Sequence, residues 1–139
     1  MTIEAVVKLQ KVLRTMPQLD IITRHAFADG MYARTIWLPR NGTLVGRVSR
    51  REHFFFVVSG EMTIWSNDSA MRFKGPHLVV SPPGTKRAGF AHDPSIVMTV
   101  HRVSEKALES DLGAVEDDIA EPDEDSMYLP GNVPKELIE

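Results

Sequence analysis

The stretch "GRVSRREHFFFVVSGEMTIW" carries polar side chains with the chemistry of an anion-binding site. Arg47 and Ser49 are two residues apart, so on a β-strand they face the same side, and His53 follows shortly after. A guanidinium offers a rigid fork of N–H donors that matches a carboxylate or a phosphate, and a hydroxyl adds another donor. Two more cations, Lys86 and Arg87, come later in the chain. If the fold brings Arg47, Ser49, His53, Lys86 and Arg87 together, these residues could hold a small anion (a phosphate, a carboxylate or a nucleotide).

The sequence leaves equally open that the same cations only form ion pairs within the protein. Arg47 and Arg87 would then pair with the protein's own carboxylates, from Glu52, Asp93 or the acidic C-terminal residues, and only close the fold. His53 is the one candidate general base in this group, because the unperturbed pKa of histidine is near 6.5. The sequence assigns no reaction to it.

These residues do not predict a metal site. The chain has no cysteine, and zinc, iron or manganese sites use three or four histidine or carboxylate ligands. His53, His92 and His101 are the candidate ligands, and arginines at positions 47 and 87 would oppose a bound cation. We therefore expect no metal and no other cofactor.

Charge is divided unevenly along the chain. Residues 1–106 hold fifteen Lys and Arg against eight Asp and Glu, a net charge of +7, whereas residues 107–139 hold eleven acids and one lysine, a net charge of -10. This acidic tail either serves solubility or lies on a basic face of its own chain or of a neighbouring subunit. No apolar run reaches the roughly 18 residues of a membrane span, and no nucleic-acid motif is present, so we expect neither partner and a cytoplasmic location.

Three regions differ in their periodicity. Residues 1–17 place apolar side chains at helical spacing, which predicts an N-terminal helix, capped by Thr2, that covers one opening or face of the fold. Residues 26–104 hold seven or more short segments rich in Val, Ile, Thr and aromatic residues between turn residues, which predicts an antiparallel sandwich or barrel. For residues 105–139 we expect a short helix over "SEKALESDL" and an acidic tail broken by prolines.

The spacing of glycines and prolines resembles the two motifs of the cupin superfamily, which are small jelly-roll barrels. In the first motif, G-x5-H-x-H-x3,4-E-x6-G, Gly42 and Gly60 take the glycine places with a spacing one residue short. Arg47 and Ser49 then stand at the two histidine places, and His53 stands at the glutamate place. The resemblance thus retains the glycines and lacks the usual metal ligands.

The second motif, G-x5-P-x-G-x2-H-x3-N, is matched by Gly75, Pro82 and Gly84 with one extra residue before the proline. Arg87 stands at its histidine place and Ala91 at its asparagine place. The resemblance implies an all-β fold: a single cupin-like jelly-roll barrel with an N-terminal helix and an acidic C-terminal extension. Gly60 and Gly84 are expected to supply backbone conformations that residues with a Cβ resist.

The segments around "REH" and "PPGTKRAGFAHD" also look like small cupin-like proteins encoded in bacteriophage and bacterial genomes, which adds a phage-infected cell or a virion as a location. Cupins include enzymes, sugar-binding proteins and storage proteins, so the resemblance fixes no activity. Some cupin epimerases and isomerases use a histidine base without a metal. His53, with Glu52 or Tyr32 as partner, would match that arrangement.

The leading hypothesis is a metal-poor cupin-like protein that binds a small anionic ligand in an Arg- and His-lined barrel pocket. A structural or assembly protein, of phage origin, is the main alternative, and a metal-dependent cupin enzyme with atypical ligands is the third. The three aromatic residues from Phe54 to Phe56 cannot all face one core, because side chains alternate along a strand. Their outward face needs cover, so we expect a homodimer.

Overall fold

The computed structural model describes residues 2–16, 21–66, 69–104, 111–123 and 135–136. Most of the described chain is β-strand, with one helix before the strands and one after them. In chain order the elements are α1 (Ile3–Arg14), β1 (Ile22–Ala28), β2 (Met31–Leu38), β3 (Thr43–Val45), β4 (His53–Ser59), β5 (Glu61–Ser66), β6 (Ser69–Lys74), β7 (His77–Ser81), β8 (Arg87–Ala91), β9 (Ser95–Arg102), α2 (Leu112–Ile119) and β10 (Lys135–Glu136).

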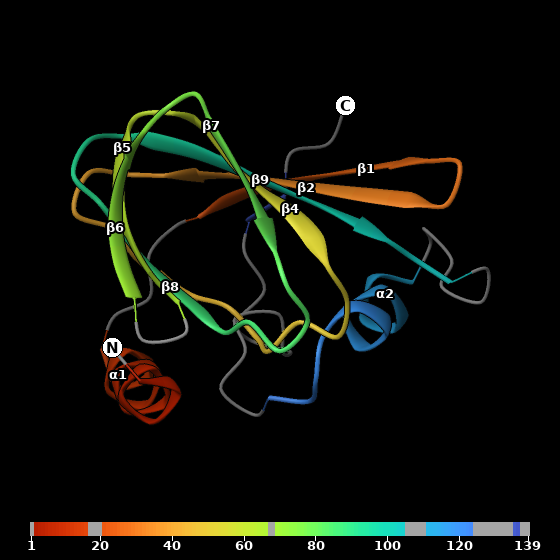
Figure 1. Ribbon diagram of the computed structural model, residues 1–139, viewed down its shortest axis with the longest axis horizontal. Helices are drawn as coiled ribbons and strands as arrows, with labels where there is room; N and C mark the ends of the chain where they lie inside the picture. The colour runs from red at the N-terminus through yellow and green to blue at the C-terminus, as the bar shows by residue number, and fades with distance from the viewer. Residues whose placement is uncertain (1, 17–20, 67–68, 105–110, 124–134, 137–139) are drawn as a thin grey trace.

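The strands form two sheets that enclose a common core (Figure 1). The larger sheet has the order β10-β1-β2-β9-β4-β7 and the smaller one the order β3-β8-β5-β6. All neighbouring strands run antiparallel except β1 and β10, which pair in parallel. The connections cross repeatedly between the sheets, since β3, β5, β6 and β8 alternate in sequence with strands of the larger sheet. The predicted all-β jelly roll is confirmed.

Strand alternation decides which side chains form the core. On β4, Phe55 and Val57 are buried, whereas Phe54 points outward and exposes 45% of its area. The inward side chains of both sheets make one apolar cluster, which consists of Ile21, Ile36, Leu38, Phe55, Val57, Met62, Ile64, Phe73, Ala91 and Val97. The prediction that the three phenylalanines split between two faces is therefore confirmed. The outer face of the larger sheet also exposes Leu78 and Val80, beside Phe54.

Two turn glycines have the conformations expected of them. Gly60 joins β4 to β5 with φ of 89°, and Gly84 precedes β8 with φ of 83°, both in the region that disfavours a Cβ. Gly60 also lies close to the start of β9: a Cβ at position 60 would come within 2.3 Å of the Ser95 hydroxyl. A side chain at position 60, where the chain passes from the larger sheet to the smaller one, would thus clash with the start of β9.

Helix α1 packs on the outer face of the smaller sheet. Thr2 caps it by accepting a hydrogen bond from the backbone N–H of Ala5 at 3.0 Å, as predicted. Its buried Val6 contacts Val45 on β3 and Ala88 on β8, so the helix covers a face of the fold. Among the described residues, no helix is long and apolar enough to cross a membrane.

The chain after β9 differs in detail from its prediction. Helix α2 covers residues 112–119 and lies further along than the predicted short helix, most of which falls outside the described residues. Asp111 caps α2 by accepting from the backbone N–H of Ala114. The first strand also begins earlier, at Ile22 rather than near residue 26. The described segment 111–123, which we call the acidic strap, lies across one end of the barrel (Figure 1).

Candidate functional site

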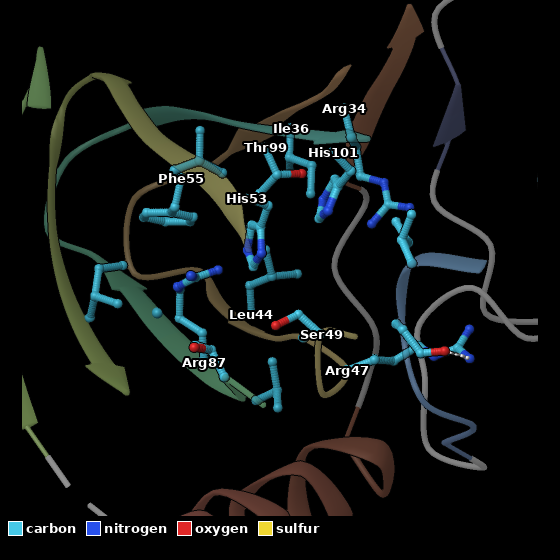
Figure 2. Close-up of a pocket in the computed structure, with 18 of the residues that line it drawn as sticks. Arg34, Ile36, Leu44, Arg47, Ser49, His53, Phe55, Arg87, Thr99 and His101 are labelled. Atoms are coloured by element: carbon cyan, nitrogen blue, oxygen red, sulfur yellow. Dashed lines mark hydrogen bonds between the residues drawn. The ribbon is translucent and has the colours of Figure 1, made fainter. Parts of the chain in front are cut away.

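A cavity of about 110 Å³ lies between the two sheets, at the end of the barrel that the acidic strap covers (Figure 2). Arg47, Ser49, His53 and Arg87 all line it. The structure thus brings together four of the five residues predicted to bind an anion. The remaining walls are largely apolar, formed by Ile36, Leu44, Val45, Phe55, Met62, Ile64, Val97 and Ile119.

Inward positions on the central strands of the larger sheet supply both polar and apolar side chains to the cavity wall. The three central strands of the larger sheet each contribute a pair of inward residues two apart: Arg34 and Ile36 on β2, His53 and Phe55 on β4, Thr99 and His101 on β9. Register aligns Thr99 with Arg34 on one side and with Phe55 on the other. These rows therefore form a single wall.

Arg87 reaches into this cavity from β8 on the opposite sheet (Figure 2). Its guanidinium carbon lies 4.1 Å from the centre of the Phe55 ring, and its Nη2 donates a hydrogen bond to the Ser81 hydroxyl. Among the described residues it forms no ion pair with a carboxylate. Burial lowers the pKa of Arg87 to about 10, so it still carries its charge at neutral pH.

Two histidines stack beside Arg87. The rings of His53 and His101 lie 4.5 Å apart between centroids with 21° between their planes. Nδ1 of His53 donates to the backbone carbonyl of Arg51 at 3.1 Å, because a carbonyl can only accept, and this leaves its Nε2 as an acceptor. Burial lowers the pKa of His53, and burial with the charges of His53, Arg34 and Arg87 lowers the pKa of His101 to about 2. Both rings are neutral at pH 7.

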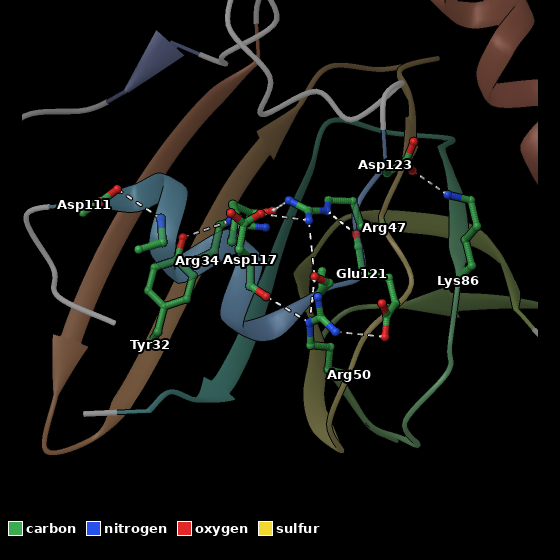
Figure 3. A network of polar contacts seen from close by, with 12 residues as sticks. Tyr32, Arg34, Arg47, Arg50, Lys86, Asp111, Asp117, Glu121 and Asp123 are labelled. Carbon is green, nitrogen blue, oxygen red and sulfur yellow. Dashed lines mark hydrogen bonds and ion pairs between the residues drawn. The ribbon is translucent and has the colours of Figure 1, made fainter. Parts of the chain in front are cut away.

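Opposite charges join the barrel to the acidic strap at one end of the cavity, and we call this charged boundary its mouth (Figure 3). Five cations of the barrel each meet a carboxylate of the acidic strap: Arg34 with Glu116, Arg47 with Glu116 and Asp117, Arg50 with Glu121, Arg51 with Asp118, and Lys86 with Asp123. The described part of the acidic tail therefore lies on a basic face of its own chain. This was one of the two arrangements considered from the charge split.

Arginines also satisfy the backbone at the end of α2. Arg50 Nε donates to the carbonyls of Asp117 and Ala120, and Arg47 Nε donates to the carbonyl of Glu121 at 2.8 Å. These carbonyls are the unsatisfied acceptors of a helix C-terminus, where a cation is favourable. Backbone bonds from Arg50 to Ile119 and from Glu121 to Val48 add to them. The strap is thus joined to the loop between β3 and β4.

Lys86 and His92 do not line the cavity. The Lys86 ammonium lies beneath the strap and donates to the Gly46 carbonyl and to Asp123, each at 2.9 Å. His92 follows β8, and its Nε2 lies 2.7 Å from the Thr63 hydroxyl. Ser49 does line the cavity, and its hydroxyl donates weakly to the Pro82 carbonyl at 3.4 Å. The tight turn before β8 therefore positions Ser49.

The residues at this site do not fit the divalent metal that the cupin resemblance would imply. His53 and His101 stack face to face, so their nitrogens do not converge on one point, and Arg34 and Arg87 add positive charge. No group of three or more His, Cys, Asp or Glu suited to a metal occurs within the described part of the chain.

Sequence patterns missed several lining residues. Arg34 and Thr99 occupy inward positions on β2 and β9, and strict alternation from Ile36 and Val97 would have placed them. The Thr99 hydroxyl is buried and has no hydrogen-bond partner in the part of the chain that the structure describes. Glu116 gave no such signal, because only tertiary packing brings residue 116 to the cavity.

Comparison with known proteins reports on the fold. No protein-family model and no curated protein matches the chain. Similar solved structures include a cupin superfamily protein from Desulfitobacterium hafniense, with a TM-score of 0.54, 9% identity, and coverage of 64% of this chain and 83% of that one. KdgF from Halomonas sp. gives a TM-score of 0.55, 18% identity, and coverage of 67% and 88%. The Schizosaccharomyces pombe Cnp3 cupin domain gives 0.53, 14% identity, and coverage of 66% and 72%.

At these identities the likeness concerns architecture alone. The chain has a cupin-like jelly-roll fold, as its resemblance to the cupin motifs implied. Cupin-like folds carry many functions, so the function is argued from the cavity and its charges.

Proposed function

We propose that this protein binds a small organic anion in the cavity between its sheets, with Arg87 as the anchoring cation. The observation that carries the proposal is the position of Arg87: it faces the cavity and pairs with no carboxylate among the described residues. A buried charge without a counter-ion is costly, and the Phe55 ring offsets only part of that cost. An anionic ligand would supply the missing partner.

Arg47 has a different part in this proposal from the one expected of it. Its side chain is 8% exposed and pairs with Glu116 and Asp117. It therefore fixes the strap over the cavity, while Ser49 and His53 remain near Arg87 as candidate polar contacts for the ligand. His53 remains the candidate base, since its Nε2 is an acceptor, but ligand binding needs no proton transfer.

Native mass spectrometry and metal analysis of one sample, purified without chelator, test this proposal. We expect a metal-free protein with a small anionic molecule that is lost on denaturation and absent from the Arg87→Met variant. Arg40→Gln is the matched control, because Arg40 is exposed and pairs with Asp93 far from the cavity lining. One metal per chain, or the same adduct in Arg87→Met, would overturn the proposal.

A structural or assembly role is the second candidate, and one observation favours it. Phe54, Leu78 and Val80 lie on one outer sheet face and expose about half of their area, 45%, 55% and 56%. An apolar patch of this kind favours self-association. Sedimentation of the wild type beside a Phe54→Ser, Leu78→Ser variant tests this: a wild-type dimer that becomes monomeric in the variant would support it, and a wild-type monomer would remove it.

A further inference from the structure

The charges around the cavity leave room for one negative charge. Glu116 is shared by two arginines, with Oε1 toward Arg34 and Oε2 3.3 Å from Arg47. Asp117 adds a second carboxylate to Arg47 at 3.4 Å. Of the three lining arginines, Arg87 alone lacks a carboxylate within the described residues. A monoanion would balance Arg87, whereas a dianion would bring an unbalanced charge into a cavity whose wall already includes Glu116.

The histidines do not change this count. His53 and His101 are both buried, and burial lowers the pKa of each, so neither adds positive charge at neutral pH. Nδ1 of His53 is engaged by the Arg51 carbonyl, and its Nε2 can only accept. The histidines therefore offer no charge to a second acidic group.

The rest of the cavity suits an apolar body. Six lining residues from the two sheets are aliphatic or thioether side chains: Ile36, Leu44, Val45, Met62, Ile64 and Val97. The absence of a side chain at Gly89 keeps this wall intact, since a Cβ there would come within 2.9 Å of the Met62 methyl group. A fully hydrated anion such as phosphate would lose its water against these walls without replacement. A carboxylate with a short branched carbon chain would bury its carbons there.

One further polar group in the cavity lacks a partner among the described residues. The Thr99 hydroxyl is buried on the inward face of β9 and makes no hydrogen bond within that part of the chain (Figure 2). Buried hydroxyls usually find a partner, and one left open in a binding cavity is a natural contact for a ligand oxygen. Arg87 and Thr99 lie on opposite sheets, so a ligand between them would be held from both sides.

We infer that the cavity selects small monocarboxylates with a compact apolar body, that Arg87 and Thr99 hold the ligand's oxygens, and that Glu116 excludes dianions. This inference rests on the proposed function and names its ligand class. Glu116 acts here as a specificity-determining residue, because its carboxylate lines the cavity and neutralises the two arginines at the mouth.

Calorimetric titration with five probes tests the inference: isobutyrate, isovalerate, succinate, inorganic phosphate and the neutral isobutyramide. We expect the two monocarboxylates to bind at least about 10-fold more tightly than the other three. Arg87→Met should remove that advantage and Thr99→Val should weaken it, while Arg40→Gln should leave it unchanged. Glu116→Gln should bring succinate closest to the monocarboxylates, because the repelling charge is gone and Arg34 and Arg47 are less neutralised.

The outcomes separate the two proposals. Tighter binding of succinate by the wild type would overturn the monocarboxylate class and leave the binding of an organic anion intact, whereas tighter binding of phosphate would overturn both. Equal binding of isobutyrate and isobutyramide, or no binding of any probe to ligand-free protein, would overturn both. An unchanged preference in a folded Glu116→Gln variant would overturn the role of Glu116. The wild-type ranking decides the ligand class even if Arg87→Met does not fold.

Discussion

The mouth of the cavity and its floor, by which we mean the group of Arg87, His53 and His101, both contain cationic side chains. The two regions differ in whether a carboxylate of the protein pairs with the cation. At the mouth, Arg47, Arg51 and Lys86 are matched by carboxylates of the acidic strap. On the floor, Arg87 lies against Phe55 and Ser81 and has no carboxylate partner among the described residues. The mouth cations serve the fold, because they hold a segment that is distant in sequence. The floor cation has no such structural role and is therefore the better candidate for function.

The largest effect should come from removing the carboxylate that two arginines share at the mouth. Glu116→Ala leaves the buried side chains of Arg34 and Arg47, 11% and 8% exposed, without their shared carboxylate. We expect the free energy of opening the strap to fall by about 3 kcal/mol, as for other buried ion pairs that lose one partner. Hydrogen exchange of the α2 amides, with denaturant unfolding of the whole chain, measures it.

Glu121→Ala is the matched control for this change. Glu121 belongs to the same strap, but its pair with Arg50 is 50% and 36% exposed. We expect Glu121→Ala to lower the free energy of opening the strap by only about 0.5 kcal/mol, because water and salt screen such pairs. Equal losses of stability in the two variants would mean that a buried ion pair contributes no more to holding the strap than an exposed one.

The neutral histidines on the floor predict a dependence of stability on pH. The unfolded chain takes up protons as the pH falls through about 6.5, whereas folded His101, with its pKa lowered to about 2, does not. Stability should therefore be full above pH 6.5 and decline below it, by up to about 1.4 kcal/mol per pH unit for one proton. Urea unfolding of the wild type and of His101→Gln between pH 7 and about 4 tests this, and the variant should show a smaller slope.

Carboxylates add their own loss at lower pH. The hydrogen bond with Arg51 lowers the pKa of Asp118 to about 2 from an ordinary 3.8, so its contribution is present above pH 3.8 and lost as the pH falls toward 2. A wild-type profile that is flat down to about pH 4 would show that the floor histidines are protonated or exposed, contrary to the buried stack of His53 and His101.

The same contrast shows what sequence reasoning could reach. The strand pattern predicted an antiparallel sandwich or barrel, and strand alternation placed Arg47 and Ser49 on one face. The cupin resemblance implied the jelly roll and the approach of His53 and Arg87 to them. Which arginine would be neutralised by the protein could not be predicted. That depends on where residues 116 and 117 pack, and the sequence identified that segment only as part of an acidic tail broken by prolines.

A smaller difference in stability is expected between valine substitutions at two threonines. The Thr99 hydroxyl is buried and has no partner among the residues that the structure describes, whereas the Thr85 hydroxyl donates to the Pro82 carbonyl at 2.7 Å. Thr99→Val should leave the stability of the ligand-free protein unchanged or raise it by up to about 1 kcal/mol, and Thr85→Val should lower it by about 1 kcal/mol. Thermal and urea unfolding measure both. A clear loss in Thr99→Val would mean that the hydroxyl has a structural partner and is not kept for a ligand.

Salt should have the smallest effect, and only at the mouth. Part-exposed pairs such as Arg50 with Glu121 weaken as ionic strength rises, because the screening length falls from about 10 Å at 0.1 M to about 3 Å at 1 M. We expect α2 amides to exchange a few-fold faster over that range, an effect of about 0.5 kcal/mol, while the amides of β4 and β9 around His53 and His101 keep their rates. If both regions respond alike, the strap and the barrel open as one unit. The ion pairs would then contribute to the global stability of the protein, and a ligand would not enter by local opening of the strap. If α2 alone responds, the strap is a separately opening wall of the cavity, and access to Arg87 depends on pairs that lie outside the cavity floor.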